Sequence, residues 1–331
     1  MKKLFFIFNI LSFVLLIFTY TSCSGKPRTI RTDTPTSGVA EIIADECFAP
    51  IVQEQIDVFE ALNDEATIIP VYTNERHAFE LFMADSIRVL IASRELTKNE
   101  ALIIKERKQQ LRSQKYATDA IALIVNKANP DTLISVSDIK KIMTGKIRLW
   151  KELNPDSKLG NIAVTFDTPN SSTVRYIKDS ICGGDPLGDN LRAVAIDSTT
   201  AVDIYNRTPN QQVVDYVASN PNALGIIGVN WVSNPNDSTK LSFIKNITVM
   251  SVSREDKATF DNSYKPFAAF LKLQKYPLSR DLYIMITDVR GGLPSGFVHF
   301  AAGERGQRII LKSGLLPAYS HTRVISVRPS L

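Results

Sequence analysis

Between residues 39 and 97, short apolar runs alternate with segments of helical periodicity, and this alternation constrains the fold more than any other feature of the chain. Apolar runs of about four to eight residues bounded by turns are typical of buried strands, and apolar residues at helical spacing are typical of amphipathic helices. Strands that alternate with helices predict a parallel sheet with both faces covered. The sequence therefore predicts an α/β fold, with strands at 39–44, 67–72 and 88–92 and helices at 51–62 and 76–84.

The turns that follow these strands hold the first candidate binding residues. They are Cys47, Thr73 and the pair Ser93 and Arg94. The carboxyl ends of parallel strands share one edge of an open sheet, and ligands of α/β proteins bind outside that edge. We therefore expect these side chains to lie at a ligand site.

A second candidate binding element runs from Phe166 to Ile177, where an apolar run passes through a Pro/Asn turn into a helical pattern. Its hydroxyl residues are Ser171, Ser172 and Thr173. Small hydroxyl residues leave the first N–H groups of a helix open, and N–H and O–H donors together can bind an oxyanion. The alternative is an ordinary helix cap, because Ser, Thr and Asn are preferred at the start of any helix.

Residues 1–22 have the pattern of an export signal. Two lysines precede an apolar run over 4–20, and small residues then lead to Cys23. This arrangement is similar to a bacterial lipoprotein signal, in which Cys23 becomes the acylated first residue. The alternative is a plain secretory signal followed by a chance cysteine. Residues 23–37 are polar and contain Pro and Gly, which predicts a flexible tether.

Composition narrows the classes of function. Removing the two lysines of the signal from 39 basic residues leaves 37 against 34 acidic ones, a net charge of +3. These charges are scattered, so we expect no nucleic-acid partner. His77, His299 and His321 lie far apart without a Cys/Asp/Glu cluster, so we expect no metal and no cofactor. The sequence holds no P-loop, nucleophile elbow or dinucleotide-binding pattern, and we expect no enzyme.

Besides Cys23, the mature chain has two cysteines, Cys47 and Cys182. An exported protein could oxidise them to a disulfide. Free cysteines are often simply buried, and the two residues fall in segments that we place apart. We therefore expect buried thiols.

Five short signatures, in order along residues 39–317, resemble those of the phosphate-binding (PstS-like) family of ABC-importer substrate-binding proteins. They are Phe48-Ala49-Pro50, Ile91-Ala92-Ser93, Ala117-Thr118-Asp119-Ala120 with Val125-Asn126, Gly225-Ile226-Ile227-Gly228-Val229, and Gly306-Gln307-Arg308 with Ser313-Gly314-Leu315-Leu316-Pro317.

The resemblance implies a periplasmic-binding-protein-like fold, with two lobes joined by a hinge and a central sheet flanked by helices in each. Lobe I would comprise residues 38–115 plus 246–322, and lobe II residues 116–245. The ligand would lie between the lobes and be buried when the hinge closes. The implied contacts are the backbone N–H of Phe48 and groups at Cys47, Thr73, Ser93, Arg94, Ser171, Ser172 and Thr173.

Two charged positions depart from the family's pattern. Asp167 stands where the family has an arginine, and Arg94 stands where it has the aspartate of its site. Together they predict an exchange of charges across the cleft. Arg94 would bind the oxyanion bidentately, and Asp167 would accept a phosphate proton that sulfate lacks. The alternatives are that the two residues pair with each other or face solvent. Cys47 also replaces a hydroxyl residue, and Ser172 replaces a glycine.

The resemblance thus implies a monomeric, periplasm-facing protein that captures inorganic phosphate and delivers it to an ABC permease. Its membrane contact would be the lipid on Cys23. Two alternatives stay open: a scaffold or sensor in an envelope complex without anion transport, and a protein for a different oxyanion or small organic acid.

Overall fold

The computed structural model describes residues 33–196, 208–234, 236, 242–288 and 290–319, and every structural statement below refers to them. From Asp33 on, the chain forms one compact unit. The predicted signal and Cys23 lie outside the described residues, as does most of the tether.

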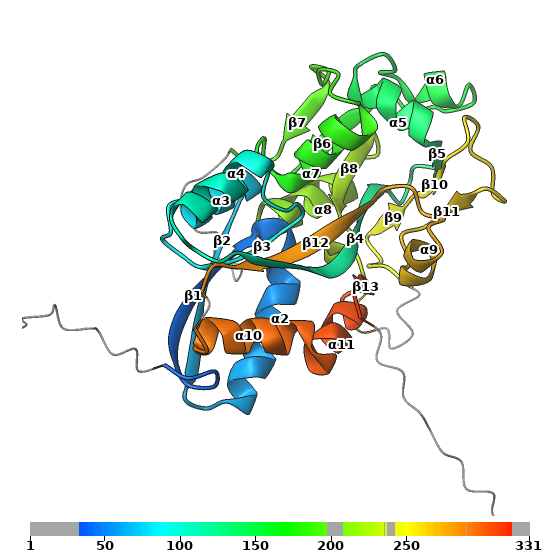
Figure 1. Ribbon diagram of the computed structural model, residues 1–331. Helices are drawn as coiled ribbons and strands as arrows, with labels where there is room; N and C mark the ends of the chain where they lie inside the picture. The colour runs from blue at the N-terminus through cyan, green and yellow to red at the C-terminus, as the bar shows by residue number, and fades with distance from the viewer. Residues whose placement is uncertain (1–32, 197–207, 235, 237–241, 289, 320–331) are drawn as a thin grey trace, which may run out of the picture. The chain divides into compact units, whose positions relative to one another are not determined.

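A ten-stranded sheet organises this unit, with the main strand order β2-β1-β3-β12-β4-β8-β6-β7 (Figure 1). β9 and β13 pair with β4 beside this path, and β11, β10 and β5 form a separate small sheet. The strands are β1 (Gly38–Asp45), β2 (Ala66–Thr73), β3 (Val89–Ala92), β4 (Arg112–Asn126), β5 (Leu133–Ser135), β6 (Ala163–Phe166), β7 (Leu191–Ala193), β8 (Ala223–Gly228), β9 (Ile247–Val249), β10 (Ser251–Ser253), β11 (Ser263–Tyr264), β12 (Ser279–Ile286) and β13 (Leu316–Pro317).

Helices flank the sheet. Within the described part of the chain, none of them combines the length and apolar character needed to cross a membrane. Their bounds are α2 (Ala49–Leu62), α3 (Glu75–Met83), α4 (Lys98–Glu106), α5 (Val136–Met143), α6 (Trp150–Leu153), α7 (Ser172–Tyr176), α8 (Pro209–Ser219), α9 (Ala268–Lys272), α10 (Leu293–Ala302) and α11 (Glu304–Lys312).

The strand–helix alternation predicted for the first part of the chain is present. β1 pairs in parallel with β2 and with β3. Because successive side chains of a strand point to opposite faces, Ile42 packs into the core that includes α2, α10 and α11, whereas Ile43 packs into the core beside α3. Phe59 of α2 meets Phe297 of α10 edge to face, with ring centroids 5.6 Å apart. The predicted α/β class is confirmed.

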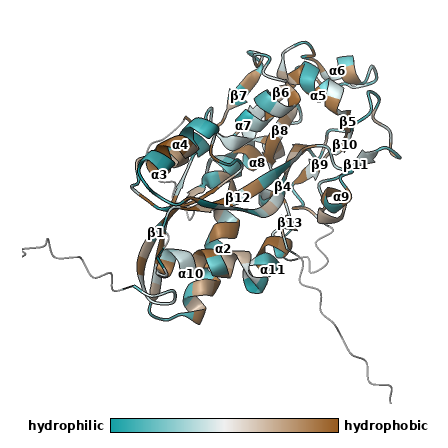
Figure 2. Cartoon of the chain, in the orientation of Figure 1, coloured by the Kyte–Doolittle hydropathy of each residue, from teal (hydrophilic) through white to brown (hydrophobic). Residues whose placement is uncertain are grey.

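β4 belongs to both parts of the sheet. Its first part pairs antiparallel with β12, and its later part pairs antiparallel with β8 and β9. All side chains from Ala120 to Val125 are buried, as expected for a strand covered on both faces. Figure 2 shows apolar residues along the strands of the sheet and on parts of α2. β4 therefore runs through both parts of the sheet and contributes to one continuous core.

The strand pairing bears on the predicted lobe bounds, which remain a proposal. β9 pairs with residues 124–126 of β4, and β10 pairs with β5. Both strands follow residue 246, yet both pair with strands assigned to lobe II. β12 is the strand after residue 246 that pairs with β3. We therefore propose that the chain returns to lobe I at β12.

Candidate functional site

The turn after β1 is held by the side chain of its N-cap residue, Asp45. Asp45, the last residue of β1, accepts a hydrogen bond at Oδ1 from the backbone N–H of Cys47 at 3.0 Å. This bond holds the single 3-10 turn at Glu46–Phe48 that leads into α2. Cys47 and Phe48 are fully buried. The turn therefore projects its side chains into the interior and away from solvent.

The start of α7 supplies hydroxyl groups. Ser171 accepts a hydrogen bond at Oγ from the backbone N–H of Val174 at 3.2 Å, which makes it the N-cap. Ser171 is therefore an ordinary helix cap, which was the alternative interpretation of this segment. Among the described hydrogen bonds, neither Ser172 nor Thr173 caps the helix, and both side chains are fully buried. Their hydroxyl groups face the turn after β1.

The Cys47 thiol joins these two elements. Its Sγ atom donates to Oδ2 of Asp167 at 3.3 Å and lies 3.4 Å from Oγ1 of Thr173. Burial, followed by the nearby carboxyl groups of Asp45 and Asp167, raises the pKa of Cys47 well above its ordinary value, so the group remains a thiol. Cys182, the other described cysteine, is also a buried free thiol.

Arg280 lies at the centre of this cluster, although the sequence did not single it out. Its side chain is 3% exposed. Nε donates to Oδ2 of Asp119 at 2.8 Å, and Nη1 donates to Oγ of Ser172 at 2.9 Å. The guanidinium carbon lies 5.0 Å from the ring centroid of Phe48. One cation therefore contacts β4, α7 and the turn after β1.

The missed pair follows from strand register. Arg280 and Asp119 are direct cross-strand partners in the β12–β4 ladder. β12 begins at Ser279, directly before Arg280. Asp119 stood within a quoted signature but received no role. The pair could have been predicted only from the register between β4 and β12, which places an arginine opposite an aspartate.

Carboxyl groups surround Arg280. Asp45, Asp119 and Asp167 are all at most 1% exposed. Burial and then Glu75 raise the pKa of Asp45 to about 7, against the opposing effect of Arg280. Burial also raises the pKa of Asp119 and of Asp167. Each of these carboxyl groups therefore keeps its proton to a higher pH than a free carboxyl group does.

Several polar atoms of the cluster are buried without a hydrogen-bond partner among the described residues. They include Oγ1 of Thr73, Oδ1 of Asp119 and Nη2 of Arg280. Most buried polar groups in folded proteins are paired, so unpaired donors and acceptors gathered in one place are typical of a site that takes a polar ligand. Donors and acceptors are both present, which suits a ligand that offers both.

Ser93 belongs to an ion-pair group beside this cluster. Its Oγ donates to Oε1 of Glu75 at 2.8 Å, and Nη2 of Arg175 donates to Ser93 Oγ at 2.8 Å. Arg175 also pairs with the Glu75 carboxylate through Nε and Nη2. This group joins the turns after β2 and β3 to α7. Ser93 is therefore engaged by protein groups, unlike Thr73.

Arg94 is held elsewhere. Its Nη1 and Nη2 atoms donate to the carboxylate of Glu100 at 2.8 and 3.0 Å, and its guanidinium carbon lies 3.4 Å from the ring centroid of Phe79. Neither the hydrogen bonds nor the ion pairs of the described residues join Arg94 to Asp167. The structure thus brings Cys47, Phe48, Asp167, Ser172 and Thr173 together, with Thr73 and Ser171 as neighbours, and it does not bring Arg94 among them.

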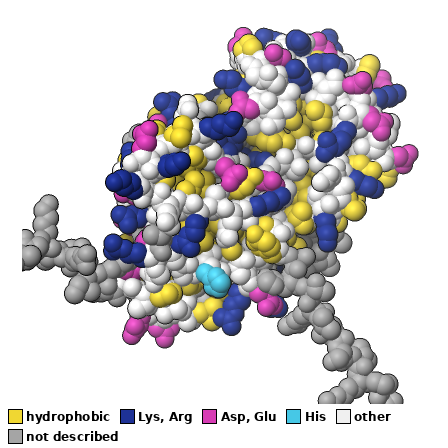
Figure 3. Space-filling model, in the orientation of Figure 1, with side chains coloured by type: hydrophobic (Ala, Val, Ile, Leu, Met, Phe, Trp, Pro, Cys, Tyr) yellow, Lys and Arg dark blue, Asp and Glu magenta, His cyan; other side chains and the backbone are white. Residues whose placement is uncertain are grey.

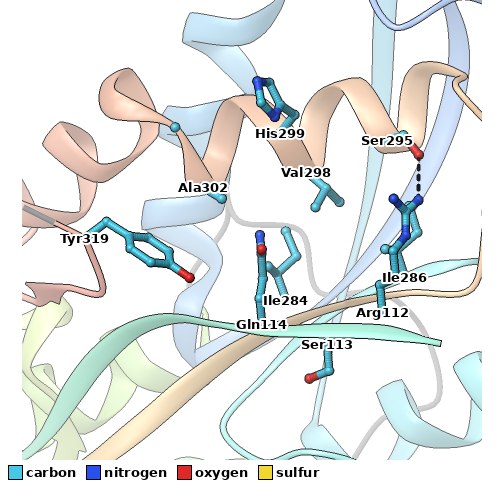
Figure 4. Close-up of a pocket in the computed structure, with 11 residues that line it drawn as sticks. Arg112, Ser113, Gln114, Ile284, Ile286, Ser295, Val298, His299, Ala302 and Tyr319 are labelled. Atoms are coloured by element: carbon cyan, nitrogen blue, oxygen red, sulfur yellow. Dashed lines mark hydrogen bonds between the residues drawn. The ribbon is translucent and has the colours of Figure 1, made fainter. Parts of the chain in front are cut away.

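Arg94 and Arg112 line two separate cavities. A cavity of about 470 Å³ has Glu75, Arg94, Ser171 and Arg175 among its lining residues, so Arg94 borders the space beside the cluster. A cavity of about 330 Å³ lies between α10 and the strands β4 and β12, where Arg112 donates to Ser295 (Figure 4). It contains none of the predicted site residues. Figure 3 shows basic and acidic side chains interspersed over the visible face.

Proteins of similar sequence include phosphate-binding proteins. A family model described as the PBP superfamily domain matches residues 29–305. The chain is 24% identical over 269 residues to the phosphate-binding protein PstS of Staphylococcus aureus (strain bovine RF122 / ET3-1), which covers 78% of this chain and 72% of that protein. It is 23% identical over 272 residues to the phosphate-binding protein PstS of Borreliella burgdorferi, with 81% and 86% covered.

Solved structures share the arrangement of elements. A Clostridium perfringens protein solved with bound phosphate matches with a TM-score of 0.68 and 20% identity, covering 85% of this chain and all of that one (100%). An ABC-type phosphate transport receptor from Vibrio cholerae matches with a TM-score of 0.60 and 20% identity, covering 84% and 99%. At these identities the likeness concerns the fold.

Proposed function

This chain belongs to the PBP superfamily, and we propose that it captures inorganic phosphate between two lobes and delivers it to an ABC importer. The periplasmic-binding-protein-like fold expected from the sequence signatures is confirmed. Proteins of this kind bind substrates for transport and do not form an enzyme family. The names of the relatives, which are phosphate-binding proteins, support phosphate as the ligand.

One observation carries the proposal: the turn after β1 and the start of α7 meet around a buried guanidinium. Cys47 and Thr173, which are 126 positions apart in the sequence, approach to 3.4 Å there. The unpaired Nη2 of Arg280 and the hydroxyl groups of Ser172 and Thr173 offer hydrogen bonds to oxyanion oxygens. In a buried site such donors count for more than in water.

The buried carboxyl groups fit phosphate better than sulfate. Phosphate near neutral pH carries at least one proton, and a carboxylate can accept a hydrogen bond from that P–OH group. Sulfate has no proton, so it offers no hydrogen bond to the unpaired Oδ1 atoms of Asp119 and Asp167. A site built around one such hydrogen bond can discriminate by about 10⁴-fold. Asp167 keeps its predicted role in selectivity under this proposal.

The test is isothermal titration of the chain from Ser24 onward, stripped of phosphate, first with phosphate and then with sulfate. We expect saturable heat with phosphate and none with sulfate at matched ionic strength. Competition with arsenate, molybdate and small carboxylates tests the alternative oxyanions and organic acids. Tighter binding of any of these than of phosphate would contradict the assignment.

A scaffold or sensor without an anion remains the second candidate, and one observation favours it. The Cys47–Asp167 hydrogen bond and the Arg280–Asp119 ion pair already engage part of the cluster with protein groups. No heat and no thermal shift with any anion, together with recovery of a stable protein complex from the envelope, would support this candidate.

A further inference from the structure

The Arg280 side chain is surrounded by groups from four elements. Asp119 of β4 pairs with Nε, Ser172 of α7 accepts from Nη1, and the Phe48 ring lies beside the guanidinium carbon. Asp45 at the end of β1 acts on it electrostatically. Burial opposes the charge, but Asp119, Cys47 and Asp45 raise the pKa of Arg280, which stays a cation.

A purely structural ion pair would explain only part of this geometry. A guanidinium has five N–H donors in a fixed fork, and Asp119 accepts from only one of them, Nε–H. Nη2 is buried and has no partner among the described residues. Leaving such a charged donor unpaired costs free energy, so its persistence needs a reason. The neighbouring Nη1 contacts only a hydroxyl group, which can rotate or yield to a stronger acceptor.

We propose that Arg280 is the residue whose guanidinium binds the oxyanion, with Nη2 and Nη1 donating to two oxygens. This inference rests on the proposed function and names a binding residue for it. Its ion pair with Asp119 orients the fork, because the two residues are cross-strand partners. Arg94 is a poorer candidate, since Glu100 already occupies both of its terminal nitrogens.

Under this proposal, the positive charge that binds the ligand comes from a different strand than the sequence predicted. The predicted exchange placed the guanidinium in the turn after β3, on the edge of the sheet. Arg280 instead brings it from β12, in the centre of the sheet between β3 and β4. A strand position is more rigid than a turn, so the guanidinium is held ready for the ligand before binding.

The test is phosphate titration of Arg280→Lys, which keeps the charge for Asp119 but removes the two-pronged donor edge. We expect a loss of affinity of at least about 10-fold, because charge-assisted bidentate hydrogen bonds are lost. The double variant Arg280→Gln/Asp119→Asn removes the ion pair as a unit and avoids an unpaired buried carboxylate. For it we expect a loss of about 100-fold or more.

The matched control is Arg112→Gln, an arginine of β4 that donates to the Asp288 carbonyl and to Ser295 (the latter in Figure 4), both outside the cluster. We expect its phosphate affinity to stay within about threefold of wild type. Far-UV circular dichroism and thermal unfolding of each variant report whether it folds. As a direct readout, the arginine side-chain NMR signals of wild type should include one buried guanidinium that shifts on phosphate addition and is absent from Arg280→Lys.

Folded Arg280→Lys with phosphate affinity within about threefold of wild type would overturn this inference and leave the proposed function intact. Wild type that binds no phosphate would overturn both. A shifted guanidinium signal that survives in Arg280→Lys would assign the contact to another arginine.

Discussion

Asp45 shows how one buried carboxyl group couples the cluster to pH. Burial and then Glu75 raise its pKa from 3.8 to about 7, while Arg280 lowers it. The folded chain therefore binds this proton more tightly than the unfolded chain does. Unfolding releases the proton between these two pKa values, so folding stability is highest at the acidic end of that window and falls as pH rises through about 7.

We predict that Asp45→Asn reduces this pH dependence. An amide cannot ionise, so the variant loses up to about 1 kcal/mol per pH unit of the slope between about pH 5 and about pH 7. Urea unfolding at several pH values in this window measures the slope. Asp189→Asn, at an exposed carboxyl group, is the control and should keep the wild-type slope. Equal slopes in wild type and Asp45→Asn would show that Asp45 ionises as in water.

Arg94 gives a second prediction at this scale. Partial burial would raise the pKa of Glu100, but hydrogen bonds from Arg94 and Thr97 lower it to about 2. We expect Arg94→Ala to return the pKa of Glu100 toward 4.5, measured by carboxyl NMR titration. The Glu100 contribution to stability is present above that value and is lost as pH falls through about 2, and its loss in the variant costs on the order of 1 kcal/mol or less.

The same variant decides between the two arginines. The predicted charge exchange requires Arg94→Ala to weaken phosphate binding by on the order of 2–4 kcal/mol. If Glu100 holds Arg94 as the structure shows, phosphate affinity should change far less than in Arg280→Lys. A larger loss at Arg94 would restore the charge exchange.

Residue identity alone could propose much of the cluster. Cys47, Ser172 and Thr173 were expected at a ligand site because they follow a strand or begin a helix, Phe48 was added by the family resemblance, and the structure gathers all four. Arg280 and Asp119 could not be paired in the same way. They are 161 positions apart, and only the register between β4 and β12 makes them neighbours.

At the scale of elements, close helix packing explains one of the sequence signatures. Gly306 of α11 lies against the end of α10, where a Cβ atom would come within 2.3 Å of the Ala301 carbonyl oxygen. Gln55 of α2 donates to the Gly306 carbonyl at 2.9 Å. Gln307 donates to the Tyr116 carbonyl at 3.1 Å, which ties α11 to β4. The Gly-Gln pair thus joins three elements of the core.

We predict that Gly306→Ala destabilises the protein by about 1–3 kcal/mol, because the backbone of α10 must move to admit the methyl group. Urea unfolding measures the change. Gly160→Ala is the control, since a Cβ atom there meets its nearest neighbour at 3.8 Å. A variant as stable as wild type would mean that α10 and α11 separate easily.

Local sequence patterns predicted where strands and helices lie better than they predicted which strands pair. The alternation of β1, α2, β2, α3 and β3 follows from periods of two and 3.6 residues that short windows reveal. The pairing of β9 and β10 does not, because these strands are only three residues long and their partners lie far back in the chain. The predicted return to lobe I near residue 246 rested on the resemblance and carried no pairing information.

At the scale of the whole molecule, we propose a lipid anchor on Cys23, which lies outside the described residues. We predict that Cys23→Ser moves the protein from the membrane fraction to the soluble fraction, because the thiol that would carry the lipid is removed. Metabolic labelling with a radioactive fatty acid and membrane fractionation check this. Ser24→Ala, at the next position, is the control and should stay labelled and membrane-bound. A soluble, unlabelled wild type would favour the plain secretory signal.

The position of β12 in the sheet has a consequence for how the chain folds. β3 and β4 are close in sequence, yet β12 lies between them and comes from near the other end of the chain. During synthesis the edge of β3 that pairs with β12 therefore has no native partner until residues 279–286 have emerged. Such long-range closure is slow, and an incomplete chain presents unpaired strand edges. The last strand pairs of this sheet therefore form only when almost the whole chain is present.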